Sequence, residues 1–177
     1  MWAREESVRP RLQSGASGRP LNSSVRPHFM ALPFHISSVP AAPFNEIGSG
    51  RFHQLYRGLV PPFIPGFRFV LVENEFAEFL RTIGVEGVVS SEEAVLCDPW
   101  TGEERTTHTC LRLRVGQCLQ DIYDLAMDGP RMLMVDDMKY FVSPTLKEVL
   151  EKTRWISYLR LSEFEWPSDF MDLGSAV

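Results

Sequence analysis

His108 and Cys110 are the residues of this chain whose types and spacing most resemble a catalytic or metal-binding pair. They lie two positions apart in the alternating segment 105–115, so a strand would put both side chains on one face. A histidine beside a thiol is typical of a cysteine nucleophile with its base, and the pair would also supply two zinc ligands. A structural zinc needs four such ligands, and the sequence holds no Cys-x-x-Cys or His-x₃-His partner. We therefore expect no metal, no cofactor and no enzymatic activity, with an enzyme using His108 and Cys110 as an alternative.

The alternation in residues 105–115 predicts which side of that strand is buried. One side is expected to face the core, and it consists of Thr107, Thr109, Leu111, Leu113 and Val115. The other side is expected to be half exposed, and it consists of His108, Cys110, Arg112 and Arg114. Its arginines would pair across a hairpin with acids at positions 92, 93, 103 and 104.

Acidic and large apolar residues in the second half of the chain suggest a surface for a protein partner. Residues 118–128 have the pattern of an amphipathic helix with an acidic face. Trp and Phe are favoured at interfaces, and acids complement a basic partner. The candidate partner-binding residues are Asp121, Asp124, Asp128, Asp136, Asp137, Trp166 and Phe170. A solvated acidic face without a partner remains an alternative.

Length and composition limit the kind of fold that can hold these residues. The chain has 177 residues, a mass of 20.2 kDa and a net charge of −5, which predicts one domain. The 3 Cys are too few for a disulfide scaffold, and no apolar run approaches the roughly 20 residues that span a bilayer. The negative charge argues against a general nucleic-acid binder. We expect a protein that acts without membrane or nucleic acid.

Charge and proline content divide the chain into segments. Residues 1–30 carry five Arg and two Glu and few large apolar residues, which predicts a disordered basic tail. A transit peptide, a weak nucleic-acid contact and a start at Met30 are alternatives. Residues 31–66 hold six prolines among many apolar residues, which predicts an extended arm packed on the core, with a turn at 48–50 and a short helix at 51–57. Residues 67–166 would form the core and 167–177 a C-terminal tail.

Two stretches of the core share a strand–helix–strand pattern. In the first, residues 67–72 predict a strand and Asn74 a helix N-cap, while Gly84 occupies a C-cap position. Spacing of i, i+3, i+4 and i+7 predicts the buried helix face: Phe76, Phe79, Leu80 and Ile83. Residues 85–89 would then resume a strand, followed by a hairpin that turns at 98–102.

The second stretch repeats this pattern 70 positions later. Residues 140–142 predict a strand, Ser143 an N-cap and Pro144 the first helical position. The buried helix face would be Leu146, Val149 and Leu150, and the closing strand would contain Ile156, Tyr158, Leu159 and Leu161. A further short strand is expected at 132–135. We expect an α+β fold: a mostly antiparallel sheet with two strand–helix–strand units and a Pro-rich N-terminal arm.

Residues 69–89 and 140–150 also carry a resemblance. The first has a strand, an acidic helix and a Gly-Val-x-Gly-Val turn at Gly84–Val88, and the second begins its helix with Ser143-Pro144. Over residues 48–166 the chain resembles bacterial predicted immunity proteins of polymorphic-toxin systems. It is also similar to a related bacterial set named for two Cys-x-x-Cys-Gly motifs, but it lacks both motifs, so no metal site carries over.

The resemblance implies a cytoplasmic, non-enzymatic protein that binds and blocks a toxin. The acidic excess after residue 30, thirteen basic against twenty-one acidic side chains, favours a basic toxin domain as the partner. A small-ligand sensor with a pocket under the Pro-rich arm is a further alternative.

Overall fold

The computed structural model describes residues 33–116, 121, 129–135 and 137–163. The first half of these residues forms β1 (Phe34–Ser38), β2 (Phe44–Gly48), β3 (Arg51–Gln54), β4 (Phe63–Pro65), β5 (Val70–Glu73), α1 (Asn74–Thr82) and β6 (Val88–Cys97). The second half forms β7 (Glu104–Leu113), β8 (Val115–Gly116), β9 (Met132–Val135), β10 (Lys139–Val142), α3 (Pro144–Leu150), the 3-10 helix η1 (Arg154–Tyr158) and β11 (Leu159–Glu163). The fold is α+β, as the sequence predicts.

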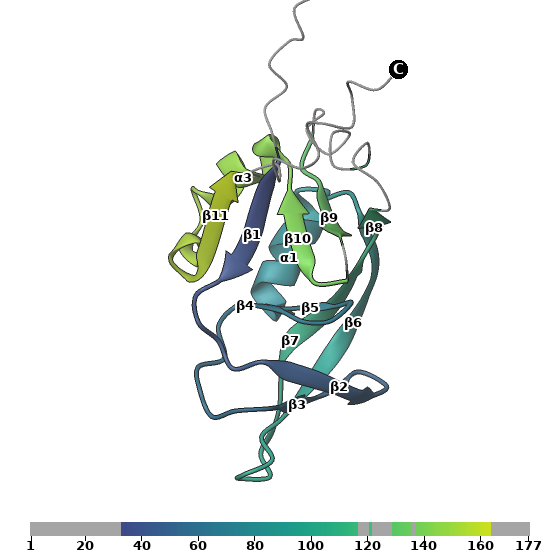
Figure 1. The fold of residues 1–177 in the computed structure, drawn as a ribbon, viewed down its shortest axis with the longest axis vertical. Helices are drawn as coiled ribbons and strands as arrows, with labels where there is room; N and C mark the ends of the chain where they lie inside the picture. Colours follow the sequence, from purple (N-terminus) through teal and green to yellow (C-terminus); the bar gives the residue numbers. More distant parts are fainter. Residues whose placement is uncertain (1–32, 117–120, 122–128, 136, 164–177) are drawn as a thin grey trace, which may run out of the picture.

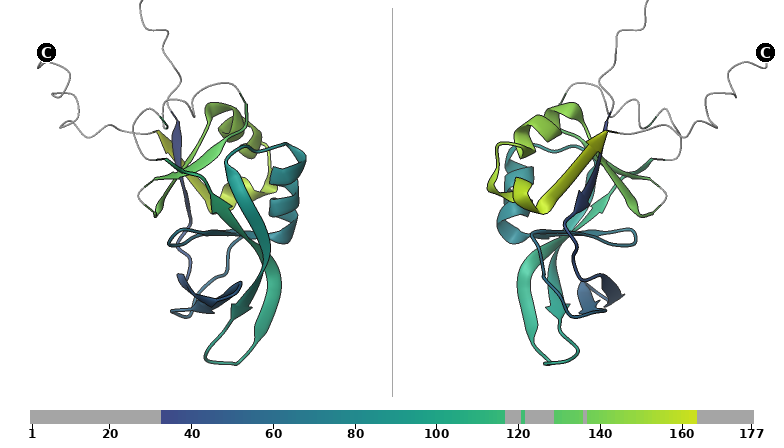
Figure 2. Two further views of the ribbon diagram at one scale, coloured as in Figure 1. Left: turned by 90° about the vertical axis from the view of Figure 1, so that its right-hand side faces the viewer. Right: turned by 60° about the vertical axis from the view of Figure 1, so that its left-hand side comes forward.

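Two mostly antiparallel sheets make up the molecule (Figure 1). The five-stranded sheet has the order β11-β1-β10-β9-β8, and the six-stranded sheet has the order β2-β3-β6-β7-β5-β4. Among the strand pairs of the described residues, only β3–β6 and β8–β9 are parallel. Figure 2 shows the β6–β7 hairpin extending away from the five-stranded sheet, with α1 packed along the side of the molecule.

The two strand–helix–strand units are split in the same way. In the first unit, β5 and β6 both pair antiparallel with β7, which therefore lies between them. In the second, β10 and β11 both pair antiparallel with β1. Each unit is thus a parallel strand pair with a crossover helix and one inserted antiparallel strand. Three pairs of buried residues 70 positions apart occupy matching places: Val72 and Val142, Phe76 and Leu146, and Leu80 and Leu150.

One large core joins both sheets and all the described helices. Its members include Ile36 of β1, Val72 of β5, Phe76 of α1 and Leu146 of α3. The ring of Trp155 in η1 stacks on that of Phe76 with a centroid distance of 4.7 Å, so the two units meet directly. A second cluster fills the opposite face of the six-stranded sheet and contains Phe44, Phe52, Ile64, Phe69, Leu71, Ala94, Leu96 and Cys110.

The helix ends confirm most of the predicted capping. Gly84 has φ +69° and its N–H donates to Arg81 O, while Val85 N–H donates to Leu80 O, so α1 ends in a Schellman motif. Ser143 is the N-cap of α3, and its Oγ accepts from Leu146 N–H at 3.2 Å. The prediction for Asn74 is wrong, because Glu73 is the N-cap of α1.

Asn74 instead ties the helix to the neighbouring strand. Its Nδ2 donates to Thr106 O at 2.8 Å, and its Oδ1 accepts from Thr109 Oγ1 at 2.9 Å. Since Asn74 follows β5 directly, these bonds fix the start of α1 against β7. The side chain therefore serves a tertiary contact in place of the local cap.

The Pro-rich segment is extended and packs on the core, and it does so as β1 to β4, which complete both sheets. The expected turn at 48–50 joins β2 and β3, but the expected helix at 51–57 is wrong. Residues 51–54 instead form β3, because buried Phe52 and Gln54 alternate with half-buried neighbours and pairing with β2 and β6 satisfies the backbone. Likewise η1 precedes the closing strand, which begins only at Leu159.

No helix in the described part of the chain is both long enough and apolar enough to cross a membrane.

Candidate functional site

His108 and Cys110 share one face of β7, as predicted, and both are buried, whereas Arg112 on the same face is half-buried and Arg114, next to it in sequence beyond β7, is exposed. Cys110 has no exposed surface and lies in the second hydrophobic cluster, and His108 is 4% exposed. The expectation of a half-exposed face is wrong for these two residues, because the second hydrophobic cluster covers this part of β7, but it holds for the arginines. On the other face Leu111 and Leu113 are in the large core, as expected, whereas Thr107 and Val115 are exposed. The alternation of the sequence fits a strand with one covered face, and it cannot reveal a second cover.

The surroundings of both groups suppress their chemistry. His108 Nε2 donates to Pro61 O at 3.0 Å and Nδ1 accepts from Thr107 Oγ1 at 2.9 Å, so the neutral ring is fully bonded. Burial lowers the pKa of His108. Burial also raises the pKa of the Cys110 thiol to about 12, so the reactive thiolate is disfavoured. In this conformation the pair serves packing, and no cluster of three or more metal-ligating side chains occurs among the described residues.

The predicted acidic surface is only partly within the described residues. Asp124, Asp128, Asp136, Trp166 and Phe170 lie outside them. Asp137 forms a two-pronged ion pair with Arg68, with distances of 2.9 and 3.0 Å. Asp121 Oδ1 lies 3.6 Å from Arg114 Nη2. Each of these two acids therefore faces an arginine.

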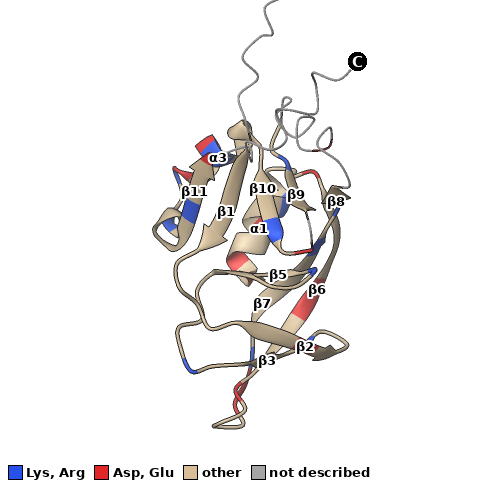
Figure 3. Ribbon diagram, viewed as in Figure 1, with Lys and Arg blue, Asp and Glu red and all other residues tan. Residues whose placement is uncertain are grey.

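Charges in the described part of the chain are nearly balanced. It holds fifteen acidic and thirteen basic side chains, whereas six further acids after residue 30 fall outside it. Figure 3 shows the charges scattered over both sheets. The β6–β7 hairpin is an exception in sequence, because residues 92–105 carry five acids and a single arginine. Arg51 and Arg112 from outside that segment pair with Glu104 and Glu92.

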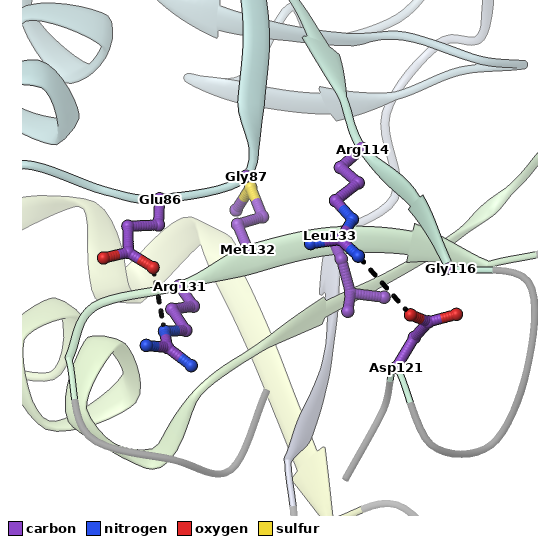
Figure 4. A pocket seen from close by; sticks show the side chains of 8 residues that line it. All are labelled: Glu86, Gly87, Arg114, Gly116, Asp121, Arg131, Met132 and Leu133. Carbon is purple, nitrogen blue, oxygen red and sulfur yellow. Dashed lines mark ion pairs between the residues drawn. The ribbon is translucent and has the colours of Figure 1, made fainter. Parts of the chain in front are cut away.

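A small pocket of about 100 Å³ lies where the two sheets meet (Figure 4). Arg131 Nε is 3.0 Å from Glu86 Oε2, so charge is balanced on this side of the pocket. Next to it, Gly87 has φ +96°, and a Cβ there would lie 1.9 Å from the Met132 carbonyl oxygen. Met132 N–H donates to Glu86 O at 2.9 Å across the junction. The pocket is therefore explained by the close approach of the two sheets at this backbone junction.

The cavity that best matches a pocket under the Pro-rich segment has a volume of about 360 Å³ and lies between Pro62, Glu73, Trp155 and Tyr158. Glu73 Oε2 accepts from Trp155 Nε1 at 2.9 Å and lies 3.4 Å from Arg154 Nη2. Polar groups that would orient a ligand therefore already bond to one another. The arrangement supports the contact between the two units more than a small-ligand site.

Exposed apolar side chains gather at the end of the molecule formed by the β3–β4 loop and the β6–β7 turn. We call this set the docking end; it consists of Leu55, Tyr56, Leu59 and Trp100. Tyr56 is 68% and Leu59 73% exposed. The guanidinium carbon of Arg57 lies 5.8 Å from the Trp100 ring centroid, which places the loop beside the turn.

Both parts of the docking end are held in place by hydrogen bonds. In the loop, Leu55 N–H donates to Pro43 O at 2.9 Å and Gln54 Nε2 donates to Gly58 O at 3.2 Å. In the turn, Asp98 Oδ1 accepts from Trp100 N–H at 2.8 Å, and these bonds lower the pKa of Asp98. The exposed side chains thus project from ordered backbone, which lowers the entropy cost of binding.

Sequence reasoning missed the docking end because it assigned the apolar residues of the Pro-rich segment to the core as a group. A signal was present: Tyr56 and Leu59 flank Gly58 just before Pro61-Pro62, and Trp100 sits within a turn motif. Large apolar residues in loops and turns face solvent unless another element covers them.

The fold defines the chain as an α+β protein of two sheets built around two split strand–helix–strand units. No family model, curated protein or solved structure matches the chain.

Proposed function

We propose that this protein is a non-enzymatic binding module that docks a basic protein partner at the docking end. The observation that carries the proposal is the exposure of Tyr56, Leu59 and Trp100 on two ordered, adjacent loops. Trp and Tyr supply large contact areas at low entropy cost and are enriched among the residues that dominate binding energy. The burial of His108 and Cys110 argues against the enzymatic alternative.

The charge of the hairpin indicates the kind of partner. Three acids lie at the Trp100 turn, Asp98, Glu103 and Glu104, and arginines pair with the last two. A basic surface would complement what remains and speed association. The resemblance to bacterial predicted immunity proteins points to the same type of partner, a basic toxin domain that the protein neutralises in the cytoplasm.

The proposal is tested with the product of the gene adjacent to the one encoding this chain. The full chain and its Tyr56→Ala and Trp100→Ala variants are titrated with that product, and growth is scored when the product is expressed with each. We expect binding and rescue by the full chain, and a loss of affinity of about tenfold or more in each variant. Met138→Ala serves as the control, because Met138 is equally exposed but belongs to the β9–β10 turn.

Two results would overturn the proposal. One is a failure of the full chain to bind the neighbouring product or to relieve its toxicity. The other is unchanged affinity in both aromatic variants, which would place the binding surface elsewhere.

A further inference from the structure

The first half of β6 is an open strand edge inside the six-stranded sheet. Strand β6 lies between β3 and β7, but β3 pairs only with Val95, Leu96 and Cys97. Residues 88–93 pair with β7 on one side and, within the described residues, with no strand on the other. In an antiparallel ladder, alternate residues point their N–H and C=O groups away from the partner. Figure 1 shows β2 and β3 crossing only the lower part of β6.

Both faces of this edge are accessible. The five residues that follow Val88 in β6 are all exposed, and Val89 is 71% exposed. On the helix side the edge borders a groove of about 290 Å³ between α1, β6 and β7. Apolar side chains line part of that groove, namely Ala77, Leu80, Val85, Val88 and Leu111. A strand added to β6 would direct alternate side chains toward this groove.

The ends of the open edge define how long an added strand can be. The β6–β7 register shifts between Val88 and Ser90 and again between Ala94 and Leu96. Such bulges twist an edge and interrupt pairing. The regular stretch is therefore Ser90 to Ala94, directly before the β3 pairing at Val95, and it matches a short segment of four to six residues.

Charge selects the occupant of this edge. Glu92 and Glu93 point to opposite faces of this stretch. Glu92 shares the face of Cys110 and lies 3.6 Å from Arg112, whereas Glu93 shares the groove face with Thr109, and no ion pair of Glu93 occurs within the described residues. A second copy of this chain, paired edge to edge, would place these acids near their equivalents, which is unfavourable. A segment with Lys or Arg at alternate positions can place those side chains on the groove face, where one of them would pair with Glu93, and its apolar residues would lie on the opposite face.

We infer that residues 88–93 of β6 bind an extended segment of the partner by strand addition, and that this segment alternates basic and apolar residues. The inference deepens the proposed function and rests on it, because it assigns the partner a second contact beyond the docking end. Main-chain hydrogen bonds would supply affinity, while Glu93 and the groove beside it would supply selectivity.

The test uses the full chain and an acetylated, amidated ten-residue peptide of alternating valine and lysine. Binding is measured by calorimetry, and protection of the residue 88–93 amides by hydrogen exchange. We expect binding with slower exchange at alternate amides of this stretch. A peptide of the same sequence, N-methylated at alternate residues, keeps the charge but loses the ladder donors, and we expect at least a tenfold loss of affinity.

A charge variant supplies the second arm. Glu93→Arg should weaken binding of the lysine peptide about tenfold and allow binding of a valine–glutamate peptide. Glu148→Arg is the matched control, because Glu148 is exposed on α3, away from β6. Equal binding of the methylated peptide, or equal effects of the two substitutions, would mean non-specific charge attraction and would overturn the inference.

Hydrogen exchange of the free protein tests whether another segment of this chain or a second copy occupies the β6 edge instead. Protection of residues 88–93 without peptide would mean that another segment of this chain covers the edge, and protection that grows with protein concentration would mean a second copy; both overturn the inference. If the peptide fails to bind while Trp100→Ala still weakens binding of the neighbouring gene's product, strand addition is refuted and the proposal for the docking end is kept. If the peptide binds as expected but no product is captured, strand addition is supported and the proposed function fails.

Discussion

The two strand–helix–strand units start their helices with different residues at the same place in the pattern. In the second unit, Ser143 Oγ caps α3 through Leu146 N–H, accepts from Arg131 N–H at 3.0 Å and donates to Gly129 O at 2.8 Å. In the first unit, Glu73 makes no side-chain cap to α1, and its carboxylate binds the Trp155 indole of the other unit.

The difference shows how one local pattern serves two purposes. Ser143 stabilises the helix and the turn that leads into it, so its effects are local. Glu73 leaves its own helix without a side-chain cap and links the two units. The effect of substituting Glu73 on stability should therefore depend on Trp155. The inserted strands differ as well: β7 carries His108, which is buried, and β1 carries His35, which is partly exposed.

Phe76→Ala is expected to break the contact between the units and to have the largest effect. Phe76 is fully buried and stacks on Trp155, so its loss leaves a cavity and unsupported indole surface. We expect a decrease of about 3–5 kcal/mol in the free energy of unfolding, measured by urea denaturation. Thr145→Ala, at an exposed position of α3, is the control. A loss below about 1 kcal/mol for Phe76→Ala would contradict a shared core.

Ser143→Ala is expected to destabilise the second unit by about 1–3 kcal/mol. The substitution removes the N-cap and leaves the buried Arg131 N–H and Gly129 O without this partner. Urea denaturation gives the change in the free energy of unfolding. Ser143→Thr keeps a hydroxyl and should recover part of the loss; no recovery would show that the hydrogen bonds are not responsible.

Glu73→Gln is expected to cost about 1 kcal/mol, since it weakens a hydrogen bond to the indole and removes the charge that faces Arg154. A double-mutant cycle with Trp155→Phe isolates the long-range part. We expect the two losses to be strongly non-additive, whereas Ser143→Ala and Trp155→Phe should add. Additive losses for Glu73 and Trp155 would refute the proposed link between the units.

Acid is expected to destabilise the protein slightly through its histidines. Burial lowers the pKa of His108 and of His35, so between the folded pKa and about 6.5 the unfolded chain binds more protons. Their contribution to stability is therefore full above about pH 6.5 and is lost as pH falls below it. The free energy of unfolding of wild type and His108→Gln, compared between pH 7 and pH 5, should show a weaker pH dependence in the variant. His35→Gln should reduce it less, and the reverse order would contradict the difference in burial.

Elements with strong local signals could be predicted from the sequence. The β6–β7 hairpin, α1 with its glycine end, and α3 with its Ser-Pro start follow from turn, cap and periodicity rules. The role of β1 could not be predicted, because its partners lie more than a hundred residues away. The candidate site was harder still: solvent exposure of Tyr56 and burial of Cys110 depend on which elements cover them, and composition does not encode that.

The position of β1 also bears on how the chain reaches its structure. This strand lies near the start of the described residues, yet it pairs with β10 and β11, the last two strands. Such pairings close long loops and slow folding, whereas the β6–β7 hairpin joins residues close in sequence. During synthesis, β1 leaves the ribosome long before β10, and it cannot complete its pairing until residue 163 of β11 has emerged. The five-stranded sheet is therefore assembled last. Until then the apolar face of β1 is exposed, and it needs protection from aggregation.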